Sequence, residues 1–171
     1  MEKPLYSIGH GTRKAEVFLE LLQRYGIKYL ADVRSRPYSR FNPHFNKNRL
    51  DNLLKEHGIT YVFMGDTLGG RPDDASCYTN GKPDYSIMAQ KPFFLEGIGR
   101  LKEAYDKGLS LAMMCSESKP GECHRSMLIA KALQALKIPV IHIDEKGELK
   151  EQDEVIKPVP KPSGPDLFSS G

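Results

Sequence analysis

The sequence has no tryptophan, only three cysteines among 171 residues and no long uninterrupted apolar run. A membrane-spanning helix needs about 20 predominantly apolar residues, so we expect no membrane protein here. The N-terminus, MEKPLYSIGH, has no apolar core followed by a small-residue cleavage site, which predicts a cytoplasmic protein rather than an exported one. An odd number of cysteines in such a chain disfavours a disulfide framework and favours reduced thiols.

The composition predicts one soluble globular domain. Hydrophobic residues make up 39% of the chain, and the net charge is +3, which is compatible with an anionic partner without requiring one. We expect a single domain over residues 1–156. Residues 157–171, KPVPKPSGPDLFSSG, contain too much Pro, Gly and Ser to pack, and are interpreted as a flexible tail.

The hydrophobic pattern alternates between strand-like and helix-like segments, which is typical of stacked βα units. Strands are expected at residues 4–8, 27–34, 59–65, 109–115 and 139–143, and helices at 14–25, 46–57, 92–107 and 121–136, with a small hairpin at 144–156. This order predicts an α/β fold: an open, mainly parallel five-stranded sheet with helices on both faces, a Rossmann-like three-layer arrangement. The long segment 66–90 is interpreted as a functional lid or a flexible insertion.

Polar side chains stand at the ends of four of these strands. His10 follows the first, Asp32 and Arg34 end the second, and Gly65 and Asp66 end the third; Cys115 ends the fourth, and Glu117 follows it. In open α/β sheets ligands bind beyond the carboxyl ends of the strands. Parallel strands therefore predict that these groups meet at one edge of the sheet.

The segment MMCSESKPGECHR, residues 113–125, holds two of the three cysteines. We expect Cys123 in the first turn of its helix, where free backbone N–H groups, His124 and Arg125 favour a thiolate and a low pKa. Cys115 is then a second reacting thiol, a resolving thiol for Cys123, or a buried residue. A metal site made from these two cysteines and His10 is a weaker alternative because the chain has no C-x-x-C pair, so no metal or cofactor is predicted.

A basic loop at residues 34–49, RSRPYSRFNPHFNKNR, has five Lys or Arg residues, no acid, and interleaved aromatics. This composition suits phosphate contacts combined with base stacking, so a nucleotide or nucleic acid is the expected ligand. The alternative is a solvated loop whose aromatics pack on the sheet. The paired Gly69 and Gly70 offer a close backbone approach to a ligand, but such a pair is also an ordinary turn.

The segments SIGHGT, LADVRSRPYSRFNPHFNKNRL, GITYVFMGDTLGGRP and CSESKPGECHR together resemble the domain of unknown function 488 family. The resemblance extends from about residue 6 to residue 143. It implies an α/β fold and a polar site, without a reaction, made from His10, Asp32, Arg34, Pro37, Ser39, Cys115, Glu117, Cys123, His124 and Arg125. Gly11 and Thr12 follow His10 here, where a serine directly after the histidine is commoner in the family.

Two functions compete on these observations. The first is an enzyme that uses Cys123, with or without Cys115, on a nucleotide, nucleobase or nucleic-acid end; Glu117 or His10 is the acid/base, and Asp32 and His124 support them. Arg34 and Arg125 are then the anion clamps, and Arg36, Ser39, Arg40, Gly69 and Gly70 belong to the substrate site. The second is a non-catalytic nucleic-acid or nucleotide-binding module with packed cysteines. The tail sequence GPDLF, residues 164–168, also resembles a degenerate sliding-clamp docking peptide. The oligomeric state is left open.

Overall fold

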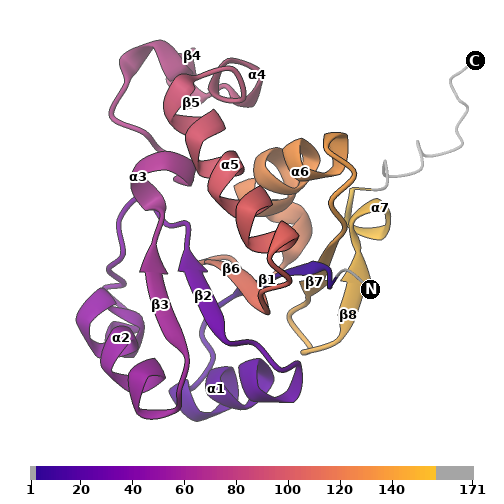
Figure 1. Cartoon of the computed structure of the whole chain (residues 1–171). Coiled ribbons are helices and arrows are strands. Elements are labelled where there is room, and N and C mark those ends of the chain that lie inside the picture. Colours follow the sequence, from indigo (N-terminus) through magenta and orange to yellow (C-terminus); the bar gives the residue numbers. More distant parts are fainter. Residues whose placement is uncertain (1–2, 157–171) are drawn as a thin grey trace, which may run out of the picture.

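The computed structural model describes residues 3–156, which form an open six-stranded sheet with helices on both faces (Figure 1). The strand order is β3-β2-β6-β1-β7-β8, and all neighbours are parallel except β7 and β8. The strands are β1 (Leu5–Gly9), β2 (Tyr29–Asp32), β3 (Thr60–Phe63), β6 (Leu111–Cys115), β7 (Val140–Ile143) and β8 (Leu149–Glu151). The predicted α/β fold is confirmed. The sixth strand, β8, is the return strand of the hairpin expected at residues 144–156.

Helices complete the two outer layers. The α-helices are α1 (Ala15–Arg24), α2 (Lys47–Glu56), α3 (Gly65–Leu68), α4 (Tyr85–Met88), α5 (Pro92–Asp106), α6 (Lys131–Ala135) and α7 (Gln152–Val155). Short 3₁₀ turns are η1 (Pro43–Phe45), η2 (Ala75–Cys77) and η3 (Pro120–Glu122), and η4 (Arg125–Ala130) is a π-helical turn. Within residues 3–156, none of these helices is both long and apolar enough to cross a membrane.

Side chains alternate between the two faces of the sheet because successive residues of a strand point in opposite directions. Ile8, Leu30 and Met114 pack against the apolar sides of α1 and α2. Met113 and Cys115 belong to the opposite core, which α5, η4 and α6 cover. The sulfur of Cys115 therefore lies under the same layer that contains Arg125.

Segment 65–90, of which residues 66–90 were expected as a long loop, has secondary structure of its own. It contains α3, η2, a two-stranded hairpin of β4 (Tyr78–Thr79) and β5 (Lys82–Pro83), and α4. The segment is anchored where α3 meets α5, since a Cβ atom on Gly97 would lie 2.7 Å from the side chain of Leu68. It forms a wall beside the carboxyl edge of the sheet.

The helix expected at residues 121–136 is interrupted at its start. Cys123 has extended backbone angles, φ −129° and ψ 150°, and lies between η3 and the π-helical turn. The expectation that Cys123 occupies the first turn of a regular helix was therefore wrong. Pro120 and Gly121 are the first two residues of the η3 turn, and the chain enters its helix only after the cysteine.

The end of β1 presses tightly on the loop that follows β6. The backbone N–H groups of His10 and Gly11 donate to the carbonyls of Cys115 and Ser116, at 2.9 and 3.0 Å. A Cβ atom on Gly9 would lie 1.5 Å from the carbonyl oxygen of Glu117. Only a residue without a side chain fits there, and this contact fixes His10 next to Cys115.

We expect Gly9→Ala to destabilise the fold by about 1–3 kcal/mol or more, because the added methyl overlaps backbone that cannot move independently of the sheet. Gly99→Ala is the matched control: Gly99 is exposed in the interior of α5, and an added Cβ there meets nothing within 4 Å. The control should gain about 0.5–1 kcal/mol from helix propensity. Urea denaturation of both variants measures this. Equal stabilities would contradict the tight contact at Gly9.

Candidate functional site

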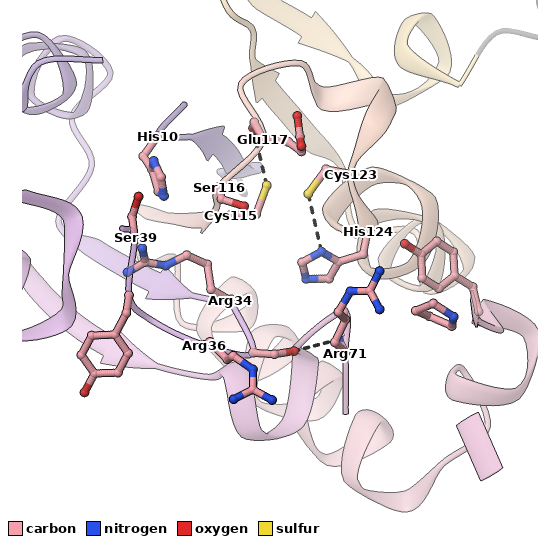
Figure 2. A pocket seen from close by; sticks show the side chains of 15 residues that line it. His10, Arg34, Arg36, Ser39, Arg71, Cys115, Ser116, Glu117, Cys123 and His124 are labelled. Carbon is pink, nitrogen blue, oxygen red and sulfur yellow. Dashed lines mark hydrogen bonds between the residues drawn. The ribbon is translucent and has the colours of Figure 1, made fainter. Parts of the chain in front are cut away.

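A pocket of about 470 Å³ opens at the carboxyl edge of the sheet. Its lining comes from the ends of β1, β2 and β6, from the basic loop, and from segment 65–90. Figure 2 shows the sulfur atoms of Cys115 and Cys123 on one wall, with His10 and Arg34 to one side and His124 and Arg71 to the other. Residues more than one hundred positions apart in the chain are thus brought to one cavity.

The centre of the site is a contact between Cys115 and Arg125. The Nε of Arg125 donates to the Cys115 sulfur at 3.0 Å, and the guanidinium is completely buried. No carboxylate of the described residues forms an ion pair with it. A guanidinium stays protonated in proteins, and a buried charge without a counter-charge is costly. The Cys115 sulfur, as a thiolate, is the group that can neutralise it.

The pKa values of the two thiols move apart. Burial by itself raises the pKa of Cys115, but a hydrogen bond from Cys123 and the charge of Arg125 outweigh it, and the pKa falls from 9.0 to about 7. The pKa of Cys123 is raised, because its hydrogen bond to Cys115 and its burial both favour the protonated thiol. The sequence-based assignment of the low pKa to Cys123 was therefore wrong. The reason is that the guanidinium of Arg125 contacts Cys115, ten positions away, while the hydrogen bond to Cys115 and burial outweigh the backbone N–H of Arg125, which by itself lowers the pKa of Cys123.

Cys123 lies next to a neutral imidazole. Its sulfur lies 3.5 Å from Nδ1 of His124, while Nε2 of His124 donates to the carbonyl of Val33 at 3.0 Å. Burial, above all, lowers the pKa of His124 to about 4, so the ring is uncharged at neutral pH. Cys123 is thus a protonated thiol that can give its proton to a group bound beside Cys115.

A buried hydrogen-bond chain holds Arg125 in place from behind. Its Nη1 donates to the hydroxyl of Ser7 at 2.6 Å, and that hydroxyl in turn donates to Nδ1 of His142. Nε2 of His142 donates to Gln152 at 2.5 Å, and Gln152 donates to the carbonyl of Ser126 at 2.9 Å. The other terminal nitrogen, Nη2, is held by the carbonyls of Glu117 and Ser118. All three nitrogens of Arg125 thus have partners within the protein.

Arg34 is held in a different way. Its Nε and Nη2 donate to both carboxylate oxygens of Asp32, at 2.9 and 2.8 Å, and Tyr61 donates to the same carboxylate at 2.6 Å. Nη2 also donates to the carbonyl of Phe45 at 2.8 Å. The remaining nitrogen, Nη1, is buried without a partner, and so is Nε2 of His10. Both residues line the pocket, so these two groups are available to a ligand.

The basic loop forms part of the rim. Arg36, Tyr38 and Ser39 line the pocket, and the Ser39 N–H donates to the side chain of Asn46 at 2.6 Å. Asn46 therefore holds this loop, and its side chain does not cap α2. Phe41 is 85% exposed, with the guanidinium of Arg40 over its ring. The two aromatics Tyr38 and Phe41 face solvent and do not pack on the sheet.

Most sequence-derived candidates line the pocket: His10, Arg34, Arg36, Ser39, Gly70, Cys115, Glu117, Cys123 and His124. Asp32, Arg40, Gly69 and Arg125 do not. Asp32 orients Arg34, and Arg40 lies outward on Phe41. Gly69 packs against Ser35, since a Cβ there would lie 2.3 Å from the Ser35 hydroxyl. The expectation that Arg125 clamps a ligand anion is corrected by its complete burial behind Cys115.

Sequence reasoning missed the residues behind Arg125. Ser7 and His142 sit opposite each other in the register of β1 and β7, and both are completely buried. The available signal was a polar residue inside each of two apolar strands, Tyr-Ser-Ile and Ile-His-Ile. It also missed Ser35, Arg71, Pro83, Tyr85 and Ser116 in the pocket lining.

A metal site is not found. Within residues 3–156, no group of three or more His, Cys, Asp or Glu side chains is arranged to hold a metal ion. The alternative site from His10, Cys115 and Cys123 therefore lacks support, and the two cysteines are free thiols. The docking peptide considered at residues 164–168 lies outside the described residues.

A protein-family model, "Domain of unknown function DUF488", matches residues 14–132. The chain belongs to this family, as its motifs had suggested. The matched stretch contains both cysteines and Arg125, whereas His10, Ser7 and His142 lie just outside it. No curated protein and no solved structure matches the chain.

The lowered pKa of Cys115 predicts that the free energy of unfolding depends on pH. A thiol with a pKa of 9.0 when unfolded and about 7 when folded contributes stability that is present above pH 9 and lost as the pH falls through 7. The stability difference between the native protein and Cys115→Ser should therefore grow from pH 7 to pH 9. Denaturant unfolding at several pH values measures it. A difference that does not change with pH would show that Cys115 is not the counter-charge of Arg125.

Ser7→Ala should raise the pKa of Cys115 toward 9, because Nη1 of Arg125 loses its acceptor and the guanidinium is less firmly held against the sulfur. The ultraviolet absorbance of the thiolate, followed as a function of pH, measures the shift. Ser110→Ala is the control, since the Ser110 hydroxyl contacts Lys3 and not Arg125. An unchanged titration in Ser7→Ala would mean that the chain behind Arg125 does not position it.

Proposed function

We propose that the chain is a cysteine-dependent enzyme that acts on a nucleotide, nucleobase or nucleic acid, with Cys115 as its nucleophile. One observation supports the proposal: the completely buried guanidinium of Arg125 donates to the sulfur of Cys115 and has no carboxylate partner among residues 3–156. Thiolates, and not thiols, are nucleophiles, and catalytic cysteines lie in electropositive surroundings. Cys77, the third cysteine, has no such surroundings, and burial raises its pKa.

The two thiols supply complementary parts of one reaction. The Cys115 sulfur forms a bond to an electrophilic atom of the substrate, and the leaving group departs with the bonding electron pair. It takes a proton from the thiol of Cys123, which is protonated and hydrogen-bonded to Cys115. Water then displaces the Cys115 sulfur from the adduct, and its released proton returns to Cys123. The site is thereby restored with the substrate hydrolysed.

The rest of the pocket suits an anionic, planar substrate. Arg36 and Arg71 are exposed cations on the lining, and Tyr38 and Tyr85 supply aromatic surface for a base. Arginine and aromatic side chains together are typical of nucleotide and single-strand sites. Glu117, exposed at the rim, is the remaining acid/base candidate besides His10. Burial lowers the pKa of His10 to about 4, so its ring is a weak base and mainly a hydrogen-bond acceptor.

The exposed aromatics favour the second candidate function, a non-catalytic binding module. Phe41 and Tyr38 are 85% and 65% exposed beside Arg36 and Arg40, an arrangement that grips a single strand without chemistry. In such a module the cysteines only pack. The module predicts binding that depends on salt and on Arg36 and Arg40 but not on Cys115.

The enzyme predicts a covalent adduct on Cys115 when the protein is incubated with a pool of nucleotides. Cys123→Ser should slow formation of the adduct by about 10²–10⁴-fold, because the leaving group lacks its proton donor. Intact-mass analysis detects the adduct, and peptide mapping of the native protein assigns it without relying on a variant. Cys77→Ser is the matched control and should leave adduct formation unchanged.

Absence of any adduct, together with nucleic-acid binding that Arg36→Ala plus Arg40→Ala abolishes and Cys123→Ser leaves intact, would favour the module over the enzyme. A salt titration of that binding separates the two further. Binding by phosphate contacts weakens linearly in log–log terms with salt, whereas adduct formation on Cys115 follows the thiolate titration near pH 7.

A further inference from the structure

Two residues that line the pocket each have a buried polar atom without a partner, and the two atoms have opposite hydrogen-bonding characters. His10 is 2% exposed and Arg34 is 5% exposed, and their unpaired atoms are Nε2 and Nη1. Buried polar groups are normally paired, and a group left unpaired in a pocket indicates where a ligand binds. What these two atoms require therefore defines the ligand.

The unpaired atom of His10 is an acceptor. Its other ring nitrogen, Nδ1, lies 2.8 Å from the carbonyl of Gly11, and a carbonyl can only accept, so Nδ1 carries the proton. Nε2 is then a lone pair. The low pKa, caused mainly by burial and opposed by the hydrogen bond to Gly11, keeps the ring neutral at pH 7. A ligand at this position must donate an N–H or O–H.

The unpaired atom of Arg34 is a donor. Its other nitrogens are occupied by Asp32 and by the carbonyl of Phe45, so Nη1 alone points to a ligand acceptor. Phe45 connects the two residues, because its ring stacks on His10 with centroids 4.5 Å apart while its carbonyl accepts from Arg34. The charge of Arg34 also acts directly on His10. Figure 2 shows both side chains on the same wall of the pocket.

A phosphate does not satisfy this pair. A phosphodiester has acceptors only, and a phosphomonoester at neutral pH is mostly in the form without a proton, so either would face the His10 lone pair with a negative oxygen. The lactam edge of a nucleobase has an N–H beside a C=O, which is the required combination. Uracil, thymine, guanine and hypoxanthine present it, whereas cytosine and adenine present an acceptor nitrogen beside an amino group.

We propose, resting on the nucleotide function above, that His10 and Arg34 form a base-recognition subsite that selects a lactam nucleobase through its adjacent N–H and C=O. His10 accepts the lactam N–H and Arg34 donates to the lactam oxygen. The phosphate of the same ligand lies toward the exposed Arg36 and Arg71 at the mouth of the pocket. Because both atoms are buried, a ligand that pairs neither of them leaves two polar groups unsatisfied and binds poorly.

The test compares each nucleoside with a counterpart that lacks only the lactam proton. Calorimetry on the native protein measures binding of uridine and 3-methyluridine, and of inosine and 1-methylinosine, with cytidine and inorganic phosphate alongside. At least one lactam nucleoside should bind about tenfold or more tightly than its methylated counterpart and than cytidine, since a buried acceptor left unpaired loses this much.

His10→Phe removes the acceptor and keeps an aromatic ring on Phe45, so the variant should bind the nucleoside and its methylated counterpart equally. His44→Phe is the matched control: His44 also contacts the Phe45 ring, at 4.3 Å, but donates to the carbonyl of Arg13 and does not line the pocket. It should keep the discrimination. If His10→Phe does not fold, the comparison of methylated and unmethylated nucleosides on the native protein still tests the subsite.

Equal binding of the methylated and unmethylated nucleosides would overturn the subsite. Binding of inorganic phosphate but of none of the nucleosides would also overturn it. Either result leaves the proposed enzyme standing if Cys115 still titrates near pH 7 and forms its adduct. Conversely, discrimination by His10 with a Cys115 that titrates near 9 would support the subsite and contradict the thiolate mechanism.

Discussion

The site depends on the burial of one positive charge without a carboxylate to neutralise it. Arg125 lies completely inside the domain, and its contacts are a sulfur, a hydroxyl and two carbonyl groups. Because its guanidinium cannot lose its proton, the surroundings must supply the negative charge, and Cys115 is the group that can. A residue that would be an ordinary buried thiol thereby becomes the most acidic cysteine of the chain.

The parallel sheet brings the residues of this site together, because its strands end at the same edge. β1, β6 and β2 end side by side, so His10, Cys115 and Arg34 leave the core at one edge, and Gly9 allows the β6 loop to touch the end of β1. β7 adds His142 opposite Ser7 in strand register. The pocket is therefore fixed by the sheet itself, and segment 65–90 only closes one side of it.

The arginines of the site differ in burial and in how many of their nitrogens the protein already pairs. All three nitrogens of Arg125 have partners in the protein, among them the sulfur of Cys115, while one buried nitrogen of Arg34 has none. Arg36 and Arg71 are exposed and free to meet anions at the mouth. In the proposed function, the same type of side chain serves as a thiolate counter-charge, as a specific donor and as a general cation, and burial separates the three uses.

The sequence predicts features that depend on residues close together in the chain, and it does not predict features that depend on contacts between distant residues. The periodicity of the apolar residues and the glycines after the helices are local properties, and they determined the α/β order, the parallel sheet and the edge at which the polar residues gather. The motif residues His10, Arg34, Cys115 and Cys123 were identified for the same reason, since each follows or ends a recognisable strand or loop.

What the sequence could not determine was which cysteine is acidic. That depends on Arg125 reaching back ten residues to Cys115, on the extended backbone at Cys123, and on Ser7 and His142, which lie more than one hundred positions apart along the chain. Electrostatic effects on a pKa depend on distances of a few ångströms between groups and on their exclusion from water. Only the tertiary structure fixes both, because the same residues in an unfolded chain are solvated and independent.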